Sequence, residues 1–325
     1  MALPKVALPE TIRAHRLRYQ ERCWALGYGC AWLGRKGEGS RDVELELLHQ
    51  IHAHGFRYFD TAPAYGESEI RVGQFVREID REAIFLASKV SLKTDQPVGE
   101  QIVAGVHRSL ERLQTSWIDL IQVHDIQALD RLFPDGGKAA VMEAVEGLKA
   151  AGLIRNFGLA SRPVDVLQAA VDSGRIESIL TFSDFSPVDP AAWRLIRGAA
   201  AKEVATIHGS PLIGGALAGN DPRGIGTYPV FHYEWRRERA IRAYDICQAH
   251  GVSTLAVALQ FPLREAAMDI MLTGPASTAE LQSTLDALSA PVPESLWAAL
   301  AEAFHWSDYH TVTPVRKDPM IIEKP

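Results

Sequence analysis

The stretch from Arg57 to Glu69 reads RYFDTAPAYGESE. Its first residues favour a short strand that ends on the carboxylate of Asp60, and the next residues favour a turn that carries Pro63 and Tyr65. The acidic residues after the turn are typical of the first turn of a helix. The stretch therefore predicts a strand, a turn and a helix in succession, with an Asp and a Tyr close together.

The same order recurs along the chain. The run AIFLASKV (83–90) is continuously apolar up to Lys89, as in strands buried on both faces, and the amphipathic segment 99–114 follows it. In total we expect eight strands, each followed by a helix, at 23–34, 58–60, 83–90, 117–126, 154–161, 178–185, 203–212 and 268–274. Eight alternating units predict an α/β protein of the (β/α)8 TIM-barrel class, and an open doubly wound sheet is the alternative.

The chain shows no shift in composition that would mark a second domain. We therefore expect a single barrel domain over 1–325, with an N-terminal arm or hairpin at 1–22 and a C-terminal tail at 306–325.

Charge and composition exclude several classes of partner. The formal net charge of −6 comes without a basic patch, so we expect neither nucleic acid nor a membrane surface as partner. No stretch approaches the roughly 20 apolar residues that span a bilayer, and the N-terminus lacks the apolar run of a signal peptide. Three scattered cysteines fit a reducing compartment, so we expect a cytoplasmic protein.

In a barrel of this class the chemistry lies at the carboxyl ends of the strands. This rule selects a set of pocket candidates from the sequence: Asp60, Lys89, His124, Ser161, Thr181, Ser210 and Gly274. His49, His52 and His54 lie on a helix away from those ends, and we expect no metal site.

Four residues near the strand ends form a plausible proton relay. Tyrosine has a pKa of about 10, so Tyr65 needs a nearby cation to act as an acid or base at neutral pH. We expect Lys89 to lower the pKa of Tyr65, Asp60 to hold Lys89 charged, and His124 to orient the reacting oxygen. The relay has no electron source of its own, so a redox reaction requires a cofactor.

The order and spacing of these residues resemble the aldo-keto reductase family. FDTAPAYG is similar to that family's Asp-Thr-Ala-x-x-Tyr-Gly motif, ASKV to its lysine strand and DLIQVHDI to its histidine strand, and the resemblance extends from Gly27 to Leu288. It implies a (β/α)8 barrel, a nicotinamide cofactor across the strand ends and direct hydride transfer. It also implies that Tyr65 is the acid/base.

The residues that would contact the cofactor match the family's pattern less closely than the residues of the relay do. The family's Ser-Asn pair reads Ala160-Ser161, its strand-six glutamine is Thr181, and the tyrosine before Ser-Pro-Leu is Gly209. These departures resemble the branch that includes L-galactose and D-arabinose dehydrogenases. The cofactor-binding positions implied by the resemblance are Gly29, Cys30, Asp60, Ser161, Thr181, Ser210, Leu212, Gly274, Ser277, Glu280 and Thr284.

The eighth loop bears on the choice between NAD and NADP. Positions that are basic in NADPH-preferring relatives are Gly274 and Glu280 in this chain. A carboxylate accepts a hydrogen bond from a ribose 2′-hydroxyl and repels a 2′-phosphate, so we expect NAD rather than NADP. The alternative is that Glu280 only faces solvent in the first turn of a helix.

On the substrate side we expect Trp32 and Asp125 beside Tyr65 and His124, with the loop from Gly224 to Trp235 over the mouth. An aromatic wall with a few acceptors suits a small polyhydroxylated ring. The expected partner is therefore a small-molecule sugar or alcohol, bound by a monomer or a small homo-oligomer.

The leading functional hypothesis is an NAD-dependent aldose 1-dehydrogenase, which oxidises C1 of a sugar such as L-galactose, L-fucose or D-arabinose to the lactone. The alternatives are a dehydrogenase of pyridoxal or another small alcohol, an NADPH-dependent carbonyl reductase and, outside the enzymes, an accessory barrel subunit of an ion channel.

Overall fold

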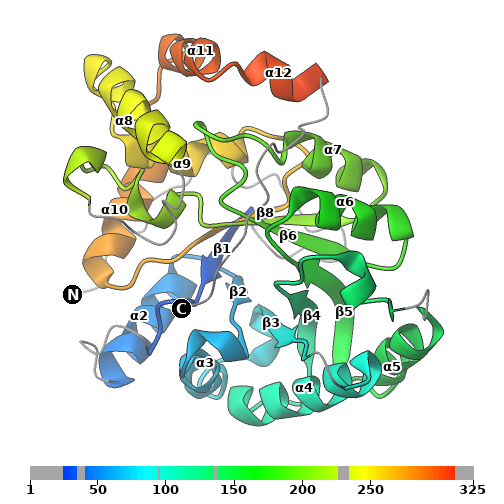
Figure 1. Cartoon of the computed structure of the whole chain (residues 1–325). Helices are drawn as coiled ribbons and strands as arrows, with labels where there is room; N and C mark the ends of the chain where they lie inside the picture. Colours follow the sequence, from blue (N-terminus) through cyan, green and yellow to red (C-terminus); the bar gives the residue numbers. More distant parts are fainter. Residues whose placement is uncertain (1–24, 35–40, 94–95, 135–137, 226–233, 312–325) are drawn as a thin grey trace.

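The computed structural model describes residues 25–34, 41–93, 96–134, 138–225 and 234–311. Within them, eight parallel strands close into a barrel in sequence order, with β8 beside β1. Helices surround the ring of strands (Figure 1). The predicted (β/α)8 barrel is confirmed, whereas the arm expected at 1–22 lies outside the described residues.

The strands are β1 (Leu26–Gly29), β2 (Tyr58–Asp60), β3 (Phe85–Ser91), β4 (Ile118–His124), β5 (Ile154–Ala160), β6 (Ser178–Phe182), β7 (Ala205–Gly209) and β8 (Ile270–Thr273). The helices are α2 (Arg41–Ala53), α3 (Ser68–Val76), α4 (Val98–Leu113), α5 (Lys138–Ala150), α6 (Val164–Ser173), α7 (Trp193–Ala201), α8 (Glu234–Ala249), α9 (Thr254–Leu263), α10 (Thr278–Ser289), α11 (Glu294–Ala303) and α12 (Trp306–Thr311).

Alternate strand residues fill the inside of the barrel. Tyr58 and Phe85 stack there with ring centroids 5.0 Å apart, and small residues such as Ala87 make room for them. At Gly27 a Cβ would lie 2.7 Å from the side chain of Leu272, so only glycine fits in β1 at this height. The interior is therefore a packed core with no room for a ligand below the strand ends.

In its described residues, the connection from β7 to β8 contains two α-helices. Helix α9 packs against α10 and β8 in the ring, whereas α8 packs against α11 outside it (Figure 1). The first residues of the expected C-terminal tail are not extended but form α12. Trp306 anchors this helix, because its ring lies 4.8 Å from that of Phe261 and its indole N–H donates to the carbonyl of Pro187. The expected tail at 306–325 therefore begins with a short helix, and residues 312–325 lie outside the described part of the chain.

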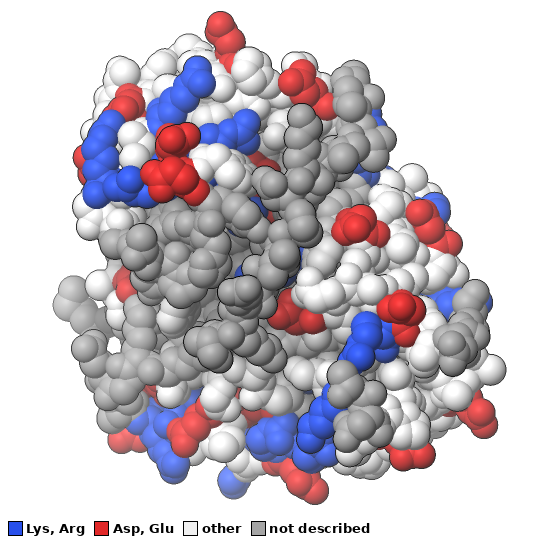
Figure 2. All heavy atoms as spheres, viewed as in Figure 1, with Lys and Arg blue, Asp and Glu red and all other residues white. Residues whose placement is uncertain are grey.

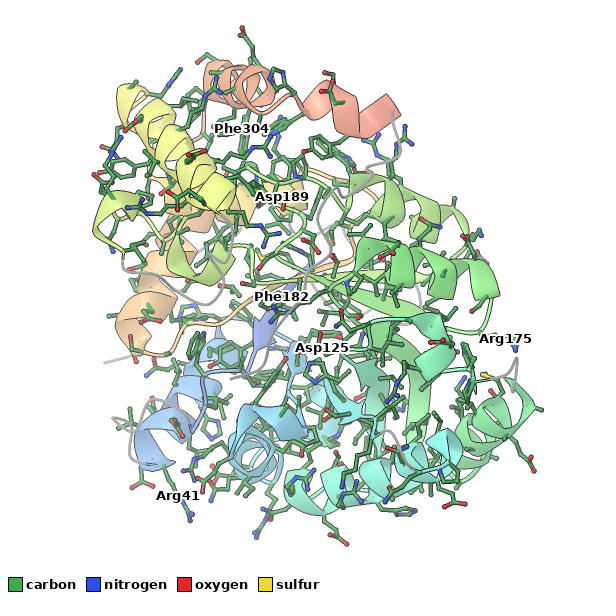
Figure 3. All side chains as sticks on the ribbon, viewed as in Figure 1. Arg41, Asp125, Arg175, Phe182, Asp189 and Phe304 are labelled. Carbon is green, nitrogen blue, oxygen red and sulfur yellow. The ribbon has the colours of Figure 1, made fainter. Side chains whose placement is uncertain are left out.

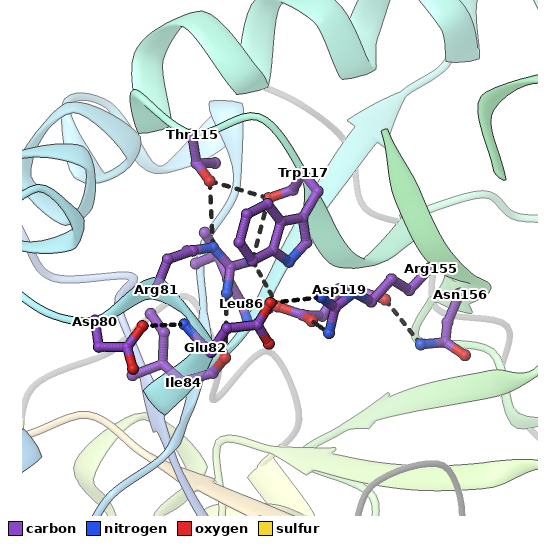
Figure 4. Close-up of polar contacts among 10 residues, drawn as sticks. All are labelled: Asp80, Arg81, Glu82, Ile84, Leu86, Thr115, Trp117, Asp119, Arg155 and Asn156. Atoms are coloured by element: carbon purple, nitrogen blue, oxygen red, sulfur yellow. Dashed lines mark hydrogen bonds and ion pairs between the residues drawn. The ribbon is translucent and has the colours of Figure 1, made fainter. Parts of the chain in front are cut away.

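A buried carboxylate joins the strands at the opposite end of the barrel from their carboxyl ends (Figure 4). Asp119 accepts hydrogen bonds from Arg81 at 2.6 Å and from the backbone N–H of Leu86 at 2.9 Å, and it pairs with Arg155 at 3.2 Å. The two guanidinium groups lie over the ring of Trp117, at 4.5 and 5.1 Å from its centre. Asp119 thereby connects β3, β4 and β5 where they begin.

The described surface carries charges of both signs. On the face drawn in Figure 2, Lys and Arg side chains lie among Asp and Glu side chains. None of the helices in the described ranges is long and apolar enough to cross a bilayer.

We predict that Asp119→Asn lowers the free energy of unfolding by about 3 kcal/mol, because it leaves two arginines without their shared counter-charge. Denaturant titration followed by circular dichroism measures this loss. The matched control is Asp172→Asn, which removes an exposed ion pair with Lys202 and should change stability by less than about 1 kcal/mol. Equal effects of the two substitutions would contradict a stabilising role for the Asp119 network.

Candidate active site

The loop after β2 is fixed by hydrogen bonds to its neighbours. The backbone N–H of Thr61 donates to the carbonyl of Ala87 at 2.9 Å, and the hydroxyls of Thr61 and Ser68 lie 2.8 Å apart. Ser68 donates onward to the carbonyl of Cys30, so its hydroxyl accepts from Thr61. The turn that carries Tyr65 is therefore held at both ends against β1 and β3.

Lys89 is buried at the centre of the site. Asp60 lies beside Ala87 in the sheet, so Lys89, two residues further along β3, reaches over the end of β2. Its ammonium donates to the Asp60 carboxylate and, at 3.0 Å, to the carbonyl of Thr61. Lys89 and Asp60 are only 1% and 2% exposed. The ion pair thus satisfies a cation that would be costly to bury alone.

Tyr65 and His124 lie above this ion pair. The Lys89 ammonium is 4.9 Å from the centre of the Tyr65 ring. The rings of Tyr65 and His124 meet edge to face, with centroids 6.0 Å apart and planes at 84°. His124 ends β4, beside Ser91 in the sheet. The structure therefore brings together all four residues of the expected relay.

The pKa of Tyr65 is set mainly by burial and by Lys89. Lys89 lowers this pKa, as expected from the sequence, but burial raises it by more, so the pKa of Tyr65 lies above its ordinary value. At neutral pH the Tyr65 hydroxyl is protonated, so it is a proton donor first and a base only in more alkaline solution.

Lys89 is charged at neutral pH, whereas His124 is neutral. Burial lowers the pKa of Lys89, but Asp60 and Tyr65 raise it by more, so the ammonium form persists. Burial, Lys89 and Arg162 together lower the pKa of His124 to about 3. His124 is therefore neutral at physiological pH and has one N–H to donate to an oxygen atom in front of it.

The ends of β1 and β8 approach each other closely. A Cβ at Gly274 would lie 2.8 Å from the carbonyl oxygen of Gly29 and 3.7 Å from the ring of Trp32, so glycine is required there. Cys30, in contrast, is fully buried, and its backbone N–H donates to the carbonyl of Asp60 at 2.8 Å. The Cys30 side chain is therefore buried below the mouth, and its contact with a cofactor stays a prediction.

The side chain of Thr181 does not face the mouth of the barrel. In β6, Leu180 belongs to the barrel interior, so Phe182 points inward as well and Thr181 points outward. Thr181 pairs with His208 of β7, whose ring packs edge-on against Phe185 at 6.0 Å, in the layer between strands and helices. The strand-end residue that faces the mouth from β6 is Phe182, which the sequence analysis missed.

Arg162 is the second residue that the sequence analysis missed. It follows Ser161, whose hydroxyl donates to the carbonyl of Ile126 at 2.5 Å and so ties the loop after β5 to the loop after β4. The guanidinium carbon of Arg162 lies 4.8 Å above the centre of the Phe182 ring. The signal was present in the sequence, because a charged residue next to a strand end in a barrel belongs to the rim.

The loop after β7 has an unusual backbone. Ser210, Ile213, Gly214 and Gly215 all have positive φ, at 57°, 48°, 61° and 100°, and Leu212 lies between them. Ile213 is β-branched, so this conformation is strained and is found mostly at functional sites. The backbone N–H groups of Ile213 and Gly215 donate to the carbonyls of Ser210 and Leu212 within the loop. The expected cofactor residues Ser210 and Leu212 lie in this strained loop, and their contact with a cofactor stays a prediction.

The loop after β8 leads into the N-terminus of α10. Ser277 caps this helix by accepting from the N–H of Glu280 at 3.2 Å, and the Glu280 carboxylate accepts from the N–H of Ala276 at 2.8 Å. Glu280 therefore places a negative charge where a helix terminus would otherwise attract an anion. Thr284, one turn further along, is buried.

Two expected substrate residues lie exposed near the mouth. Trp32 follows β1 and is 37% exposed. Asp125 follows His124 with a positive φ of 58° and is exposed, and Figure 3 shows it and Phe182 toward the middle of the ring of strands. Most of the loop expected over the mouth, residues 226–233, lies outside the described part of the chain.

A closed (β/α)8 barrel with a buried Lys–Asp pair beneath a Tyr and a His is the arrangement of a class of nicotinamide-dependent oxidoreductases. Residues 25–304 match the model of the aldo/keto reductase family, and the chain belongs to that family.

Two curated relatives act on sugars. D-threo-aldose 1-dehydrogenase of a Pseudomonas species is 29% identical, over 86% of this chain and 93% of that protein. L-galactose dehydrogenase of Arabidopsis thaliana is 25% identical, over 82% and 84% of the two chains. A solved aldo-keto reductase structure from Pseudomonas aeruginosa shares the fold with a TM-score of 0.63 at 22% identity, over 86% of this chain and 96% of that one. The chain is therefore an oxidoreductase with aldose dehydrogenases among its relatives.

We predict a pH-dependent loss of stability from His208. Burial lowers its pKa to about 3, whereas an unfolded histidine binds a proton below about pH 6.5. Acid therefore favours the unfolded chain, and the free energy of unfolding should fall by about 1.4 kcal/mol per pH unit from this residue as the pH drops from 6.5 toward 3. Urea titrations at several pH values between 4 and 8 measure the free energy of unfolding. This free energy should depend less steeply on pH in His208→Phe than in the wild-type protein, and an equal pH dependence in the two proteins would contradict this account.

Proposed function

We propose that the chain is an NAD-dependent aldose 1-dehydrogenase that oxidises C1 of a neutral or substituted sugar to its lactone. The observation that carries the proposal is the buried Lys89–Asp60 pair beneath the Tyr65 hydroxyl, with a neutral His124 ring edge-on to it. The sugar substrate is supported by the names of the two curated relatives, both of which are sugar dehydrogenases.

In this proposal each residue of the relay acts on one oxygen atom, the C1 hydroxyl of the sugar. His124 donates its N–H to that oxygen and fixes its position. Tyr65, as the phenolate, accepts the hydroxyl proton as the C1 carbonyl forms. Lys89 stabilises the negative charge on Tyr65, and Asp60 keeps Lys89 in place. The bound nicotinamide supplies the acceptor for the hydride that leaves C1.

Residues of the strand-end loops would hold the dinucleotide. The strained segment Ser210–Gly215 would lie against its diphosphate. Ser161 and Phe182 lie at the strand ends next to His124, where the nicotinamide ring would bind. Glu280 at the N-terminus of α10 supports NAD over NADP, because its carboxylate already occupies a backbone N–H that a 2′-phosphate would need.

We predict that the rate of oxidation rises with pH. The raised pKa of Tyr65 means that its phenolate, the form that accepts the proton, increases about tenfold per pH unit until the group is ionised. The kcat/KM for oxidation should therefore rise from pH 7 toward alkaline values. Tyr65→Phe should lower kcat by about 10²- to 10⁴-fold at every pH. Retention of activity within tenfold in that variant would rule out the relay.

We predict that Glu280→Arg increases the use of NADP. Replacing a negative charge by a positive one beside the 2′-position should raise the ratio of kcat/KM for NADP to that for NAD by about tenfold or more. Glu280→Gln separates charge from helix capping, because the amide can still accept from Ala276, and it should give a smaller rise. Glu302→Arg on α11 makes the same charge change away from the site and should leave the ratio as it is. A ratio that is unchanged in Glu280→Arg would place Glu280 away from the cofactor.

A substrate panel tests the proposal as a whole. L-galactose, L-fucose, D-arabinose, pyridoxal and simple aldehydes are each incubated with NAD and NADP or their reduced forms, and the absorbance of reduced nicotinamide is followed. We expect the highest kcat/KM for an aldose with NAD. Oxidation of pyridoxal alone, or reduction of simple aldehydes with NADPH as the main activity, would overturn the sugar assignment.

A further inference from the structure

Arg162 is held at a fixed place on the rim of the barrel. The residue before it, Ser161, donates its hydroxyl to the carbonyl of Ile126 and its backbone N–H to the carbonyl of Leu180. These two bonds tie the start of the β5–α6 loop to the loops on either side of it. Arg162 therefore projects from a rigid position between the ends of β4 and β6, beside His124.

The guanidinium of Arg162 is also oriented. It lies over the inward-facing ring of Phe182, with its central carbon 4.8 Å from the ring centre. An aromatic ring attracts a guanidinium to its face and leaves the N–H groups around the edge of the guanidinium plane. Those N–H groups form the fork that binds a carboxylate or phosphate through two parallel hydrogen bonds.

Within the described residues, nothing neutralises the positive charge of Arg162. No carboxylate in the described ranges forms an ion pair with Arg162, and no hydrogen bond joins its guanidinium to a described residue. Asp125, an acid that follows His124, is exposed and forms no ion pair with Arg162. Lys89, the other cation of the site, is in contrast already paired with Asp60.

The charge of Arg162 acts directly on the reacting end of the site. Together with burial and Lys89, it lowers the pKa of His124 to about 3. A ligand atom in contact with His124 therefore lies within the field of Arg162. A sugar bound at His124 has a free cation on one side and the exposed Trp32 elsewhere on the rim.

From these observations we infer that Arg162 is a specificity residue that binds an anionic group of the substrate. The substrate class is a sugar that carries a carboxylate or a phosphate at a carbon other than C1. This inference rests on the proposed oxidation of an aldose at C1 and narrows it to charged aldoses. The two anionic groups share one recognition chemistry, and the experiment below separates them.

The test compares matched sugars that differ only in charge. For each aldose oxidised by the protein, the uronate and the terminal phosphate ester of the same stereochemistry are assayed with NAD. The quantity measured is the ratio of kcat/KM for the anionic sugar to that for the neutral one. This ratio is insensitive to the amount of folded protein and to cofactor affinity, because both affect the two sugars equally.

In the wild-type protein we expect a ratio above one for the uronate or the phosphate ester. Arg162→Gln should lower that ratio about tenfold or more, and Arg162→Lys should retain part of it because the charge remains while the fork is lost. The preference should also weaken as salt is added. A ratio that does not change in Arg162→Gln would overturn the inference, including the case in which Arg162 serves the cofactor and both sugars lose activity equally.

Arg175 offers a matched control. It too lies over an aromatic ring, 5.8 Å from the centre of Phe133, but Figure 3 shows it at the outer edge of the molecule. Arg175→Gln removes one stacked arginine without touching the mouth, so the ratio should stay at the wild-type value. A fall equal to that of Arg162→Gln would mean that net charge, rather than position, sets the preference, and would contradict the inference.

A binding measurement keeps this test independent of the proposed reaction. Calorimetric titration of the uronate into wild-type protein and Arg162→Gln requires no turnover. If no aldose is oxidised, the proposed function fails, yet tighter uronate binding by the wild type still supports an anion site at Arg162. Equal affinities in the two proteins would exclude that site even if aldoses are oxidised.

Discussion

The buried ion pair between Lys89 and Asp60 is the constraint on which the arrangement at the carboxyl ends of the strands depends. An ammonium that is 1% exposed is tolerated only when its donors are satisfied, and the two partners come from β2 and from the loop that follows it. β2 and β3 must therefore be neighbours in a fixed register. The same pair places a positive charge directly beneath Tyr65, so one interaction both orders the strands and prepares the reacting group.

The two ends of the barrel use buried charge differently. At the amino ends of the strands, Asp119 is surrounded by two arginines and a backbone N–H, so its charge is neutralised and it serves stability. At the carboxyl ends, Lys89 is neutralised, Arg162 has no counter-charge among the described residues, and His124 is kept neutral. Arg162 thus lies at the end of the barrel where ligands bind in this fold.

Much of this arrangement follows from the sequence. Continuous apolar strands alternating with amphipathic helices predict the barrel, and the spacing of Asp60, Tyr65, Lys89 and His124 predicts that they meet. The remaining features could not be predicted for physical reasons. The sequence does not show which residues of β6 face inward, and a one-residue difference exchanges the two faces, so Phe182 rather than Thr181 faces the mouth. The net pKa of Tyr65 depends on how deeply its ring is buried, because burial outweighs the lowering by Lys89. Arg162 was missed because its position over Phe182 is a contact between the loop after β5 and the end of β6, which the sequence does not show.

Trp306 links the end of the described chain to the rim of the site. Its indole N–H is bonded to Pro187, in the β6–α7 connection that begins just after Phe182, and the same connection is held by the buried pair between Asp189 and Arg236. All eight strands are complete before residue 305. A chain shortened to that point would keep every element of the barrel and all four relay residues. It would nevertheless lose the hydrogen bond from Trp306 to Pro187, which helps to fix the β6–α7 connection next to Phe182, the ring that Arg162 contacts. The segment that supports the site therefore extends past the last strand of the barrel.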